Sequence, residues 1–523
     1  MKKTIMLLLL TGSGFAGLCQ QSSKAVEYAA TITAGDLSKH LHIIASDSLQ
    51  GRETGEKGQK MAANYIAGEF FDYGLQPVVT NSDNAKSYYQ PFELVRRSWG
   101  EVFVETAKGK KEFLKDFFFL GDVTIQEAIQ TEVVFVGYGI ETDKYSDYND
   151  IDVAGKTVLI WSGEPKDKKG NSLVSGTSTE SEWAASYQKK AALARQKGAS
   201  YVIVVTKDQD ALDKTLNNYR NSFMHPTLGF PDAKKLNTGT MFVSPSTAAD
   251  ILNVSPDKLK KQQKRISRRK KPSINPASIT IKAERKEAMV GTENVLGLVE
   301  GTDKKDEIIV VTAHYDHEGI KDGKIYNGAD DDGSGTVAVI ELAQAFTQAK
   351  IEGNGPRRSM LFMTVTAEEK GLLGSDYYTR NPVFPLQNTV ANLNIDMIGR
   401  VDKEHEGNPD YIYVIGSDKL SSELHKINED ANASHTRLKL DYTYNDPNDP
   451  NRFYYRSDHY NFAKNRIPVV FYFNGVHEDY HQPGDDVEKI NFQKMEKITR
   501  LVFHTAWELA NRDQRIVVDS NKQ

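Results

Sequence analysis

The chain has 523 residues, more than one compact core usually organises, so two domains are the default expectation. Its 39% hydrophobic and 10% aromatic content excludes a disordered protein. The net charge of −5 points to no polyanionic partner. The single cysteine, Cys19, excludes an intramolecular disulfide and a thiolate metal site, so any metal ligands must be His, Asp and Glu.

The amino terminus has the pattern of a secretory signal. Lys2 and Lys3 precede an apolar run at residues 5–10 and then small residues, and this run is too short to cross a bilayer. We assign residues 1–19 to a signal peptide and expect an exported protein, periplasmic or secreted. Lipidation of Cys19 is the alternative, which the bulky Leu18 disfavours. No other stretch is long and apolar enough to span a membrane.

Two segments precede the region that carries the chemistry. Residues 37–75 show helical periodicity interrupted by a loop at 51–55, which suits a plain helix connection as well as a function. From about residue 132 the pattern changes to short β-like runs at 133–136, 157–160 and 201–205. This second segment has no convergent set of histidines and acids, so we predict an inserted domain that shapes access to a site elsewhere.

The inserted segment ends in a strongly basic stretch at residues 258–271. A nucleic-acid site would interleave aromatic residues with these cations, and none are present. We therefore predict a solvated linker and no nucleic-acid partner.

From residue 294 onward, strands and helices alternate, which predicts a mostly parallel sheet covered by helices. Four buried strands are expected, at residues 308–311, 360–365, 390–395 and 467–473. Polar side chains follow each of them: His314 and Asp316, Glu368 and Glu369, Asp396, and finally Tyr480 and His481. Any one of these could be a helix cap or a satisfied core group, but together they predict a ligand site at one sheet edge.

Three adjacent acids, Asp330, Asp331 and Asp332, stand at the start of the helix after the first strand. Adjacent carboxylates repel one another unless a cation holds them, and a divalent metal is the usual solution. The sequence therefore predicts a metal site at this edge.

Five motifs in this region resemble those of the secreted di-zinc aminopeptidases, metallopeptidase family M28, and they occur in family order. They lie at residues 314–316, 328–335, 367–375, 394–399 and 479–483. The resemblance runs from about residue 294 to the end and includes 37–75, while the middle segment resembles the protease-associated (PA) domain.

The resemblance implies an α/β fold, a three-layer α/β/α sandwich around a mixed, mostly parallel sheet, with an inserted β-rich PA domain. It assigns residues 24–130 and 290–515 to the zinc peptidase domain. It assigns residues 131–289 to the PA-like insertion, with the basic linker at its end.

The resemblance also implies two zinc ions per chain and five ligands: His314, Asp331, Glu369, Asp396 and His481. Asp331 would bridge the ions, with His314 and Glu369 holding one ion and Asp396 and His481 holding the other. A cis peptide bond would follow Asp331.

Three further residues receive roles. Asp316 would accept the ring N–H of His314 and fix its tautomer. One of the two adjacent glutamates must remain free of metal to accept a proton; the residues alone leave the choice open, and the resemblance assigns Glu368 as the general base. Tyr480 could donate a hydrogen bond to the oxyanion or simply pack.

The sequence thus predicts an exported zinc aminopeptidase acting on peptides, with an undetermined oligomeric state. A carboxypeptidase or dipeptidase is the nearest rival, and Arg400 and Arg456 are its candidate carboxylate clamps. A one-zinc glutaminyl cyclase and a non-catalytic binding protein on the same scaffold are weaker rivals, because all five ligands and Glu368 are present. His317, His459 and His477 are treated as supporting or surface groups.

Overall fold

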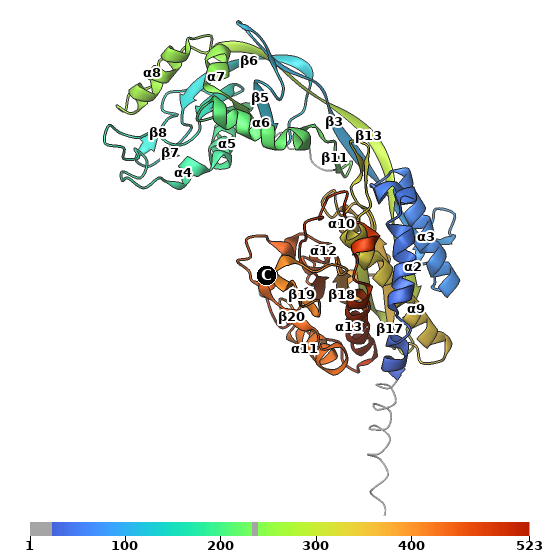
Figure 1. Ribbon diagram of the computed structural model, residues 1–523. Helices are drawn as coiled ribbons and strands as arrows, with labels where there is room; N and C mark the ends of the chain where they lie inside the picture. Colours follow the sequence, from blue (N-terminus) through green and yellow to red (C-terminus); the bar gives the residue numbers. More distant parts are fainter. Residues whose placement is uncertain (1–23, 233–238, 522–523) are drawn as a thin grey trace, which may run out of the picture. The chain divides into compact units, whose positions relative to one another are not determined.

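The computed structural model describes residues 24–232 and 239–521, so the predicted signal and Cys19 lie outside the described residues. The chain divides into two compact units (Figure 1). Unit 1 comprises Met1–Leu94 and Val290–Gln523, and unit 2 comprises Val95–Met289. The insertion therefore begins at residue 95 and not at residue 131, because the intervening residues form strands that pair within unit 2. No described helix has both the length and the apolarity to cross a membrane.

Unit 1 is built on a mixed sheet whose strands run in the order β20-β19-β21-β18-β14-β17-β13. The strands are β13 (Ala277–Val299), β14 (Lys304–His314), β17 (Arg358–Val365), β18 (Thr389–Ile395), β19 (Tyr411–Ile415), β20 (Lys439–Asp441) and β21 (Val469–Phe473). The central strands β17, β14, β18 and β21 are parallel to their neighbours in this set. Antiparallel pairs occur towards the two sides, where β13 joins β17 and β19 joins β21. The predicted mixed, mostly parallel sheet is confirmed.

Helices cover both faces of this sheet. Along β14, Ile309 and Val311 belong to one apolar cluster and Ile308 and Val310 to another, as expected when alternate side chains point to opposite faces. The first cluster includes residues of α2 (Ala34–Ile44), α3 (Lys57–Tyr73), α9 (Gly335–Ile351), α11 (Ser422–Ala431) and α13 (Phe492–Asn511). The second includes residues of α10 (Leu373–Arg380) and α12 (His459–Ala463). Unit 1 is therefore the predicted three-layer sandwich.

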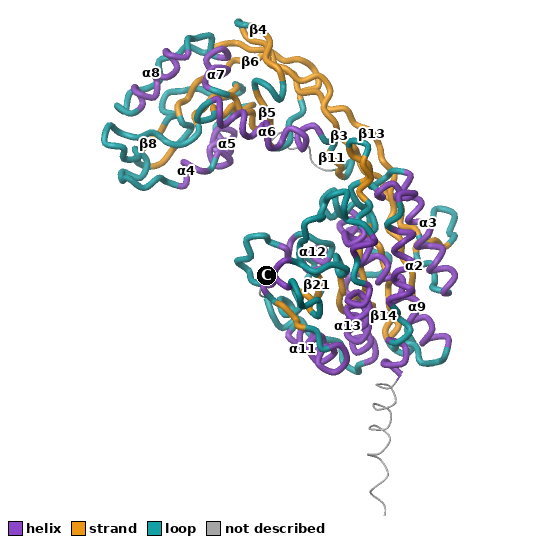
Figure 2. The backbone as a smooth tube through the Cα atoms, viewed as in Figure 1, coloured by secondary structure: helices purple, strands orange, loops and turns teal. Residues whose placement is uncertain are grey.

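Unit 2 has its own strands and helices (Figure 2). Its strands are β3 (Tyr89–Thr106), β4 (Gly109–Glu112), β5 (Phe117–Leu120), β6 (Ile125–Gly137), β7 (Glu141–Thr142), β8 (Tyr145–Ser146), β9 (Thr157–Trp161), β10 (Tyr201–Val205), β11 (Thr227–Gly229) and β12 (Thr240–Val243). Its helices are α4 (Glu182–Ala185), α5 (Tyr187–Gln196), α6 (Gln209–Met224), α7 (Pro245–Ile251) and α8 (Pro256–Ile266). The predicted strands at 133–136, 157–160 and 201–205 fall in β6, β9 and β10, which pair in parallel.

The basic stretch at 258–271 is a correction to the sequence prediction. Most of it belongs to helix α8, which Ser255 caps by accepting a hydrogen bond from the amide of Lys258. Leu259, Gln262 and Ile266 recur at three- and four-residue spacing and are buried, so one face packs on unit 2. The charge density concealed this apolar stripe, and the segment is an anchored helix, not a linker.

Candidate metal centre

The parallel strands bring the predicted residues to one sheet edge. His314 ends β14, Asp396 follows β18 directly, and Glu368 and Glu369 lie just beyond β17. His481 comes from the loop between β21 and α13. Carboxyl ends of parallel strands share one edge, which is why motifs distant in sequence converge here.

Asp331 lies at the centre of the group. Its Oδ1 is 3.3 Å from Nε2 of His314, and its Oδ2 is 3.0 Å from Nε2 of His481. The Asp331–Asp332 peptide bond is cis, as predicted. Although burial alone would raise the pKa of Asp331, hydrogen bonds from these two histidines hold that pKa well below its usual value. One short carboxylate thus faces two separate sets of ligand atoms, which is the geometry of a bridging ligand.

The two sets differ from the predicted division. Nε2 of His314 lies 3.6 Å from Oδ1 of Asp396, and Nε2 of His481 lies 3.2 Å from Oε2 of Glu369. By these distances His314 and Asp396 form one set and Glu369 and His481 the other, and Asp331 contacts both histidines. This differs from the prediction, in which His314 goes with Glu369. Strand β14 has both β17 and β18 as neighbours, so the strand order leaves both pairings open, and the short distance from His314 to Asp396 favours the β18 side.

Glu368 lines the same hollow but is left outside both sets. Its Oε2 is 3.9 Å from Nε2 of His314. Burial raises the pKa of Glu368 well above its ordinary value, His314 opposes this rise, and the charges of Glu369 and Asp396 add to it. Glu368 is thus a largely buried carboxyl beside the two sets that belongs to neither.

Asp316 supports the site by a different contact from the one predicted. Nδ1 of His314 lies 3.1 Å from the main-chain oxygen of Asp316, while the carboxylate is 3.9 Å away. That carboxylate accepts hydrogen bonds from the hydroxyl of Thr54, at 2.8 Å, and from the amide of Glu368, at 3.1 Å. The backbone carbonyl therefore fixes the His314 tautomer, and the Asp316 side chain holds the segment that carries Glu368.

The acids on either side of Asp331, Asp330 and Asp332, belong to neither ligand set. Both accept hydrogen bonds from main-chain amides. Asp332 accepts hydrogen bonds from the amides of His314, at 3.0 Å, and Met397, at 3.1 Å. Asp330 accepts one from the amide of Gly399 at 2.6 Å, and its other oxygen lies 3.2 Å from Nε2 of His477. These contacts join β14 and the loop after β18 to the Asp331 segment, so they fix where His314 and Asp396 stand.

A chain of hydrogen bonds that the sequence analysis missed orients Asp396. The hydroxyl of Ser457 donates to Oδ2 of Asp396 at 2.6 Å, and Asn394 donates to Ser457 at 2.8 Å. Asn394 in turn accepts a hydrogen bond from Thr312 at 2.6 Å. The sequence contained a signal for this chain, because Thr312 and Asn394 are polar residues on otherwise apolar strands. A buried polar group requires a hydrogen-bond partner.

Two of the three additional histidines contact the site acids. His317 is fully buried, and its Nδ1 lies 2.8 Å from Oε1 of Glu369, leaving Oε2 to face His481. His477 contacts Asp330. His459 is fully buried with its ring stacked on Phe471, and burial lowers its pKa to about 3. None of the three is a surface group.

The loop at residues 51–55 proves to support the site. The guanidinium of Arg52 is fully buried and donates hydrogen bonds to the main-chain oxygens of Ile44, Tyr315, Asn327 and Gly328. Two of these oxygens belong to the segment that leads into Asp331. The loop is therefore more than a helix connection.

One wall of the hollow is aromatic. Phe453, Phe471, Phe473 and Tyr480 line it together with Arg456 and the metal-competent residues. The Tyr480 ring stacks on His481 with 3.9 Å between centroids, and Arg456 donates a hydrogen bond to the Tyr480 hydroxyl at 3.2 Å.

Arg400, the other cation considered from the sequence, is held elsewhere. Its guanidinium lies 2.9 Å from Oδ2 of Asp479. This ion pair removes one of the two candidate carboxylate clamps.

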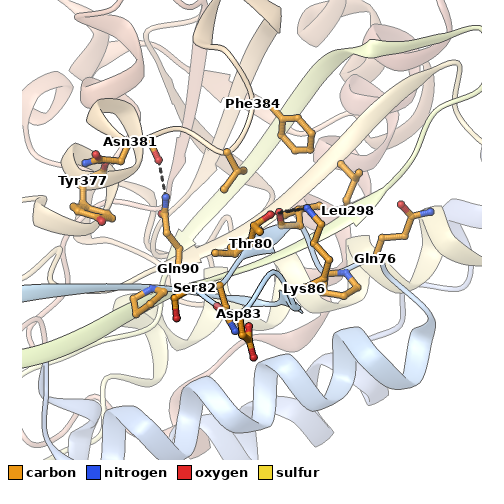
Figure 3. A pocket seen from close by; sticks show the side chains of 16 residues that line it. Gln76, Thr80, Ser82, Asp83, Lys86, Gln90, Leu298, Tyr377, Asn381 and Phe384 are labelled. Atoms are coloured by element: carbon orange, nitrogen blue, oxygen red, sulfur yellow. Dashed lines mark hydrogen bonds between the residues drawn. The ribbon is translucent and has the colours of Figure 1, made fainter.

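A larger hollow in unit 1, about 920 Å³ in volume, involves none of these residues (Figure 3). Its labelled side chains include Gln90, whose amide donates to the main-chain oxygen of Asn381 at 2.8 Å, and only Asp83 and Lys86 carry charge among its lining. Size alone therefore does not identify the site; convergence of titratable groups does.

The residues present suit two divalent metal ions. The side chains of Asp331, Glu369 and Asp396 are largely buried close together with histidine nitrogens beside them, and the burial of several carboxylates costs free energy unless a cation is bound. Imidazole nitrogens with carboxylate oxygens form a donor set typical of zinc. Three groups of described residues place their ligand atoms close enough to hold an ion: His314, Asp331 and Asp396; His317, Asp331 and Glu369; and Glu318, Glu369 and His481.

The fold and the site together define an α/β protein with a candidate two-metal centre at the carboxyl edge of its sheet. Residues 294–506 match the model of Peptidase family M28. A protein named "Probable leucine aminopeptidase" from Arthroderma benhamiae is 31% identical over 216 residues, 40% of this chain and 55% of the relative. Aminopeptidase Y from Saccharomyces cerevisiae is 28% identical over 41% of this chain and 38% of the relative.

The matched region thus spans little more than half, or less, of these relatives' lengths. Among solved structures, an aminopeptidase from Aneurinibacillus sp. strain AM-1 aligns with a TM-score of 0.56 and 19% identity, over 95% of this chain and 100% of that one. This likeness supports the fold.

Proposed function

We propose that the protein is a zinc-dependent hydrolase of peptide bonds, an aminopeptidase with two zinc ions per chain. The observation that carries the proposal is the position of Asp331 between His314 with Asp396 on one side and His481 with Glu369 on the other. The family match and the names of the relatives support the same activity.

The chain's own residues divide the chemistry. Two zinc ions, when bound, would polarise the scissile carbonyl and acidify the attacking water. Glu368 takes the proton of that water and passes it to the leaving amine. Tyr480, oriented by Arg456, is placed to donate a hydrogen bond to the oxygen that gains charge in the transition state.

The charge of the hollow supports the amino end of the peptide as the end that is recognised. Of the three acids that line it, Asp331 and Asp396 are assigned to the metals, so Glu368 is the carboxyl left to attract a free α-ammonium group. The aromatic wall suits an apolar amino-terminal side chain, consistent with the leucine preference in the relative's name.

Arg456 is the one observation that favours the rival polarity, since a guanidinium can clamp a carboxylate. One short peptide offered free, acetylated at its amino end and amidated at its carboxyl end separates the two. We expect acetylation to stop cleavage and amidation to have little effect. Cleavage of the acetylated form with loss on amidation would establish a carboxypeptidase.

We also propose that the protein is exported and that unit 2 is a PA-like domain. The signal pattern at residues 1–19 supports export, and the mixed strands and helices of unit 2 are compatible with an accessory domain. Mass spectrometry of the mature amino terminus tests the signal: cleavage near Cys19 without an acyl group is expected, and an intact residue 1 would exclude it.

A further inference from the structure

The end of helix α8 forms a cationic hollow in unit 2. Lys144, Arg269, Lys270 and Lys271 line a cavity of about 240 Å³. The rest of the lining comprises Tyr145, Ser146, Asp147, Asn149, Ile266 and Pro272. The cavity has the size of a small polar group and a surplus of positive charge.

The cations are held in place by the local fold. After α8 the chain turns back, with Arg269 in the left-handed region at φ 55° and the amide of Lys270 donating to the main-chain oxygen of Arg265 at 3.0 Å. The Arg265 side chain donates to the main-chain oxygen of Lys271 at 3.2 Å. Opposite this turn stands the β7–β8 hairpin, which contributes Lys144.

Counter-charge within the hollow is limited. Lys271 pairs with Asp150. Asp150 lies outside the lining, and the acid within it, Asp147, is buried and already accepts hydrogen bonds from the amides of Tyr138 and Ile140 and from the Tyr145 hydroxyl. Within the described residues, Lys144, Arg269 and Lys270 form no ion pair with an acid, and all three side chains are exposed to solvent.

The hollow continues into an exposed basic face. Nine lysines and arginines and no acid occupy residues 258–271, in a chain whose net charge is −5. All nine are exposed, whereas the apolar residues Leu259 and Ile266 are buried against unit 2. The face thus offers charge without apolar side chains to insert and without aromatic rings to stack on bases.

We propose that this surface docks unit 2 onto an anionic phospholipid bilayer, with one headgroup phosphate entering the hollow between Lys144 and Arg269. A dense array of basic residues without stacking groups matches a charged lipid surface better than a nucleic acid. Because no apolar side chain is exposed there, the contact is electrostatic and reversible. The net negative charge of the whole chain orients this face towards the membrane.

The test is co-sedimentation of the full-length protein with lipid vesicles, in a Cys19→Ala background that excludes an acyl anchor. Vesicles of neutral phosphatidylcholine are compared with vesicles that also contain phosphatidylglycerol. We expect binding to the second kind alone at about 0.1 M salt and its loss at about 1 M, where the screening length falls from about 10 Å to about 3 Å.

Two triple variants localise the surface. Substitution of Lys144, Arg269 and Lys270 by Gln should weaken vesicle binding about 100-fold, at roughly five-fold per cation. The control replaces three other exposed lysines of unit 2, Lys168, Lys169 and Lys214, and should retain binding within a few-fold, with peptidase activity unchanged in both.

Three results would overturn the proposal. Equal loss in both triples would show a general effect of charge. Displacement from the vesicles by low concentrations of soluble glycerol phosphate would show a free-phosphate site instead of a membrane site. Tighter binding to a single-stranded oligonucleotide than to anionic vesicles would identify a nucleic-acid surface.

Discussion

The two units place their charges in opposite ways. In unit 1, acids and histidines lie buried together at a sheet edge. In unit 2, a dense set of cations lies exposed on α8 and the turn that follows. Every group of described residues able to hold a metal belongs to unit 1. A buried cluster of like charges requires a counter-ion to be stable, whereas an exposed one is solvated and remains available to a partner.

Metal removal is the most severe test of this contrast. Chelation should abolish peptidase activity and lower the melting temperature, because the acids around Asp331 repel one another once the cations leave. Zinc should restore both properties. A metal-free preparation with full activity would contradict the proposed centre.

Glu368→Gln should separate proton transfer from metal binding. Gln retains the shape but cannot accept a proton, so we expect kcat to fall by about 10²–10⁴ with zinc content unchanged. Glu369→Gln is the matched variant and should lose metal, because Glu369 belongs to the His481 set. Elemental analysis of both proteins checks the assignment, and the reverse pattern would exchange the two roles.

Ser457→Ala should show how far the buried hydrogen bonds matter. Without the hydroxyl that holds Oδ2 of Asp396, metal affinity should fall by about 10–100-fold, measured by competition with a zinc chelator. Ser417→Ala removes another buried serine of unit 1, one that contacts His425, and should leave the affinity unchanged. Similar losses of metal affinity in both variants would indicate that any buried cavity in unit 1 weakens the site, and that the hydrogen bond from Ser457 has no particular role.

The smallest expected effect is a loss of folding stability at acidic pH, caused by His504, a residue outside the candidate metal centre. His504 is 8% exposed, and burial lowers its pKa to about 3. Below pH ~6.5 the unfolded chain takes up a proton that the folded chain does not, so stability falls as pH falls, by roughly 2 kcal/mol at pH ~5 for one group. In denaturant melts, His504→Leu should lose roughly 2 kcal/mol less of its free energy of unfolding than the wild type does between neutral pH and pH ~5. If the free energy of unfolding fell equally with pH in the wild type and the variant, His504 would not be the source of the acid sensitivity.

Much of unit 1 could be predicted because its signals are local. Apolar runs marked β14, β17 and β18, and the polar residues after them marked the edge where His314, Glu369 and Asp396 meet. The division of ligands between two sets was beyond the sequence, because it depends on the directions of side chains at the strand ends. The roles of Ser457 and Arg52 were equally hidden, since their partners lie far away along the chain.

In unit 2 the failures had other causes. Charge masked the buried stripe of α8, so an anchored helix was predicted as a linker. The early start of the insertion at residue 95 was missed because β3 is a long strand that passes from one unit into the other.

The hydrogen bonds of Arg52 have a consequence for the order in which the protein is made. Its guanidinium donates to the main-chain oxygen of Tyr315, which lies 263 positions later in the sequence. Between them the ribosome must synthesise the whole of unit 2, on the order of ten to fifty seconds of elongation. During that interval the amino-terminal helices have no sheet to cover, while unit 2 can complete its own core. We therefore expect the inserted unit to acquire protease resistance first in stalled nascent chains, and the domain it interrupts to fold around it afterwards.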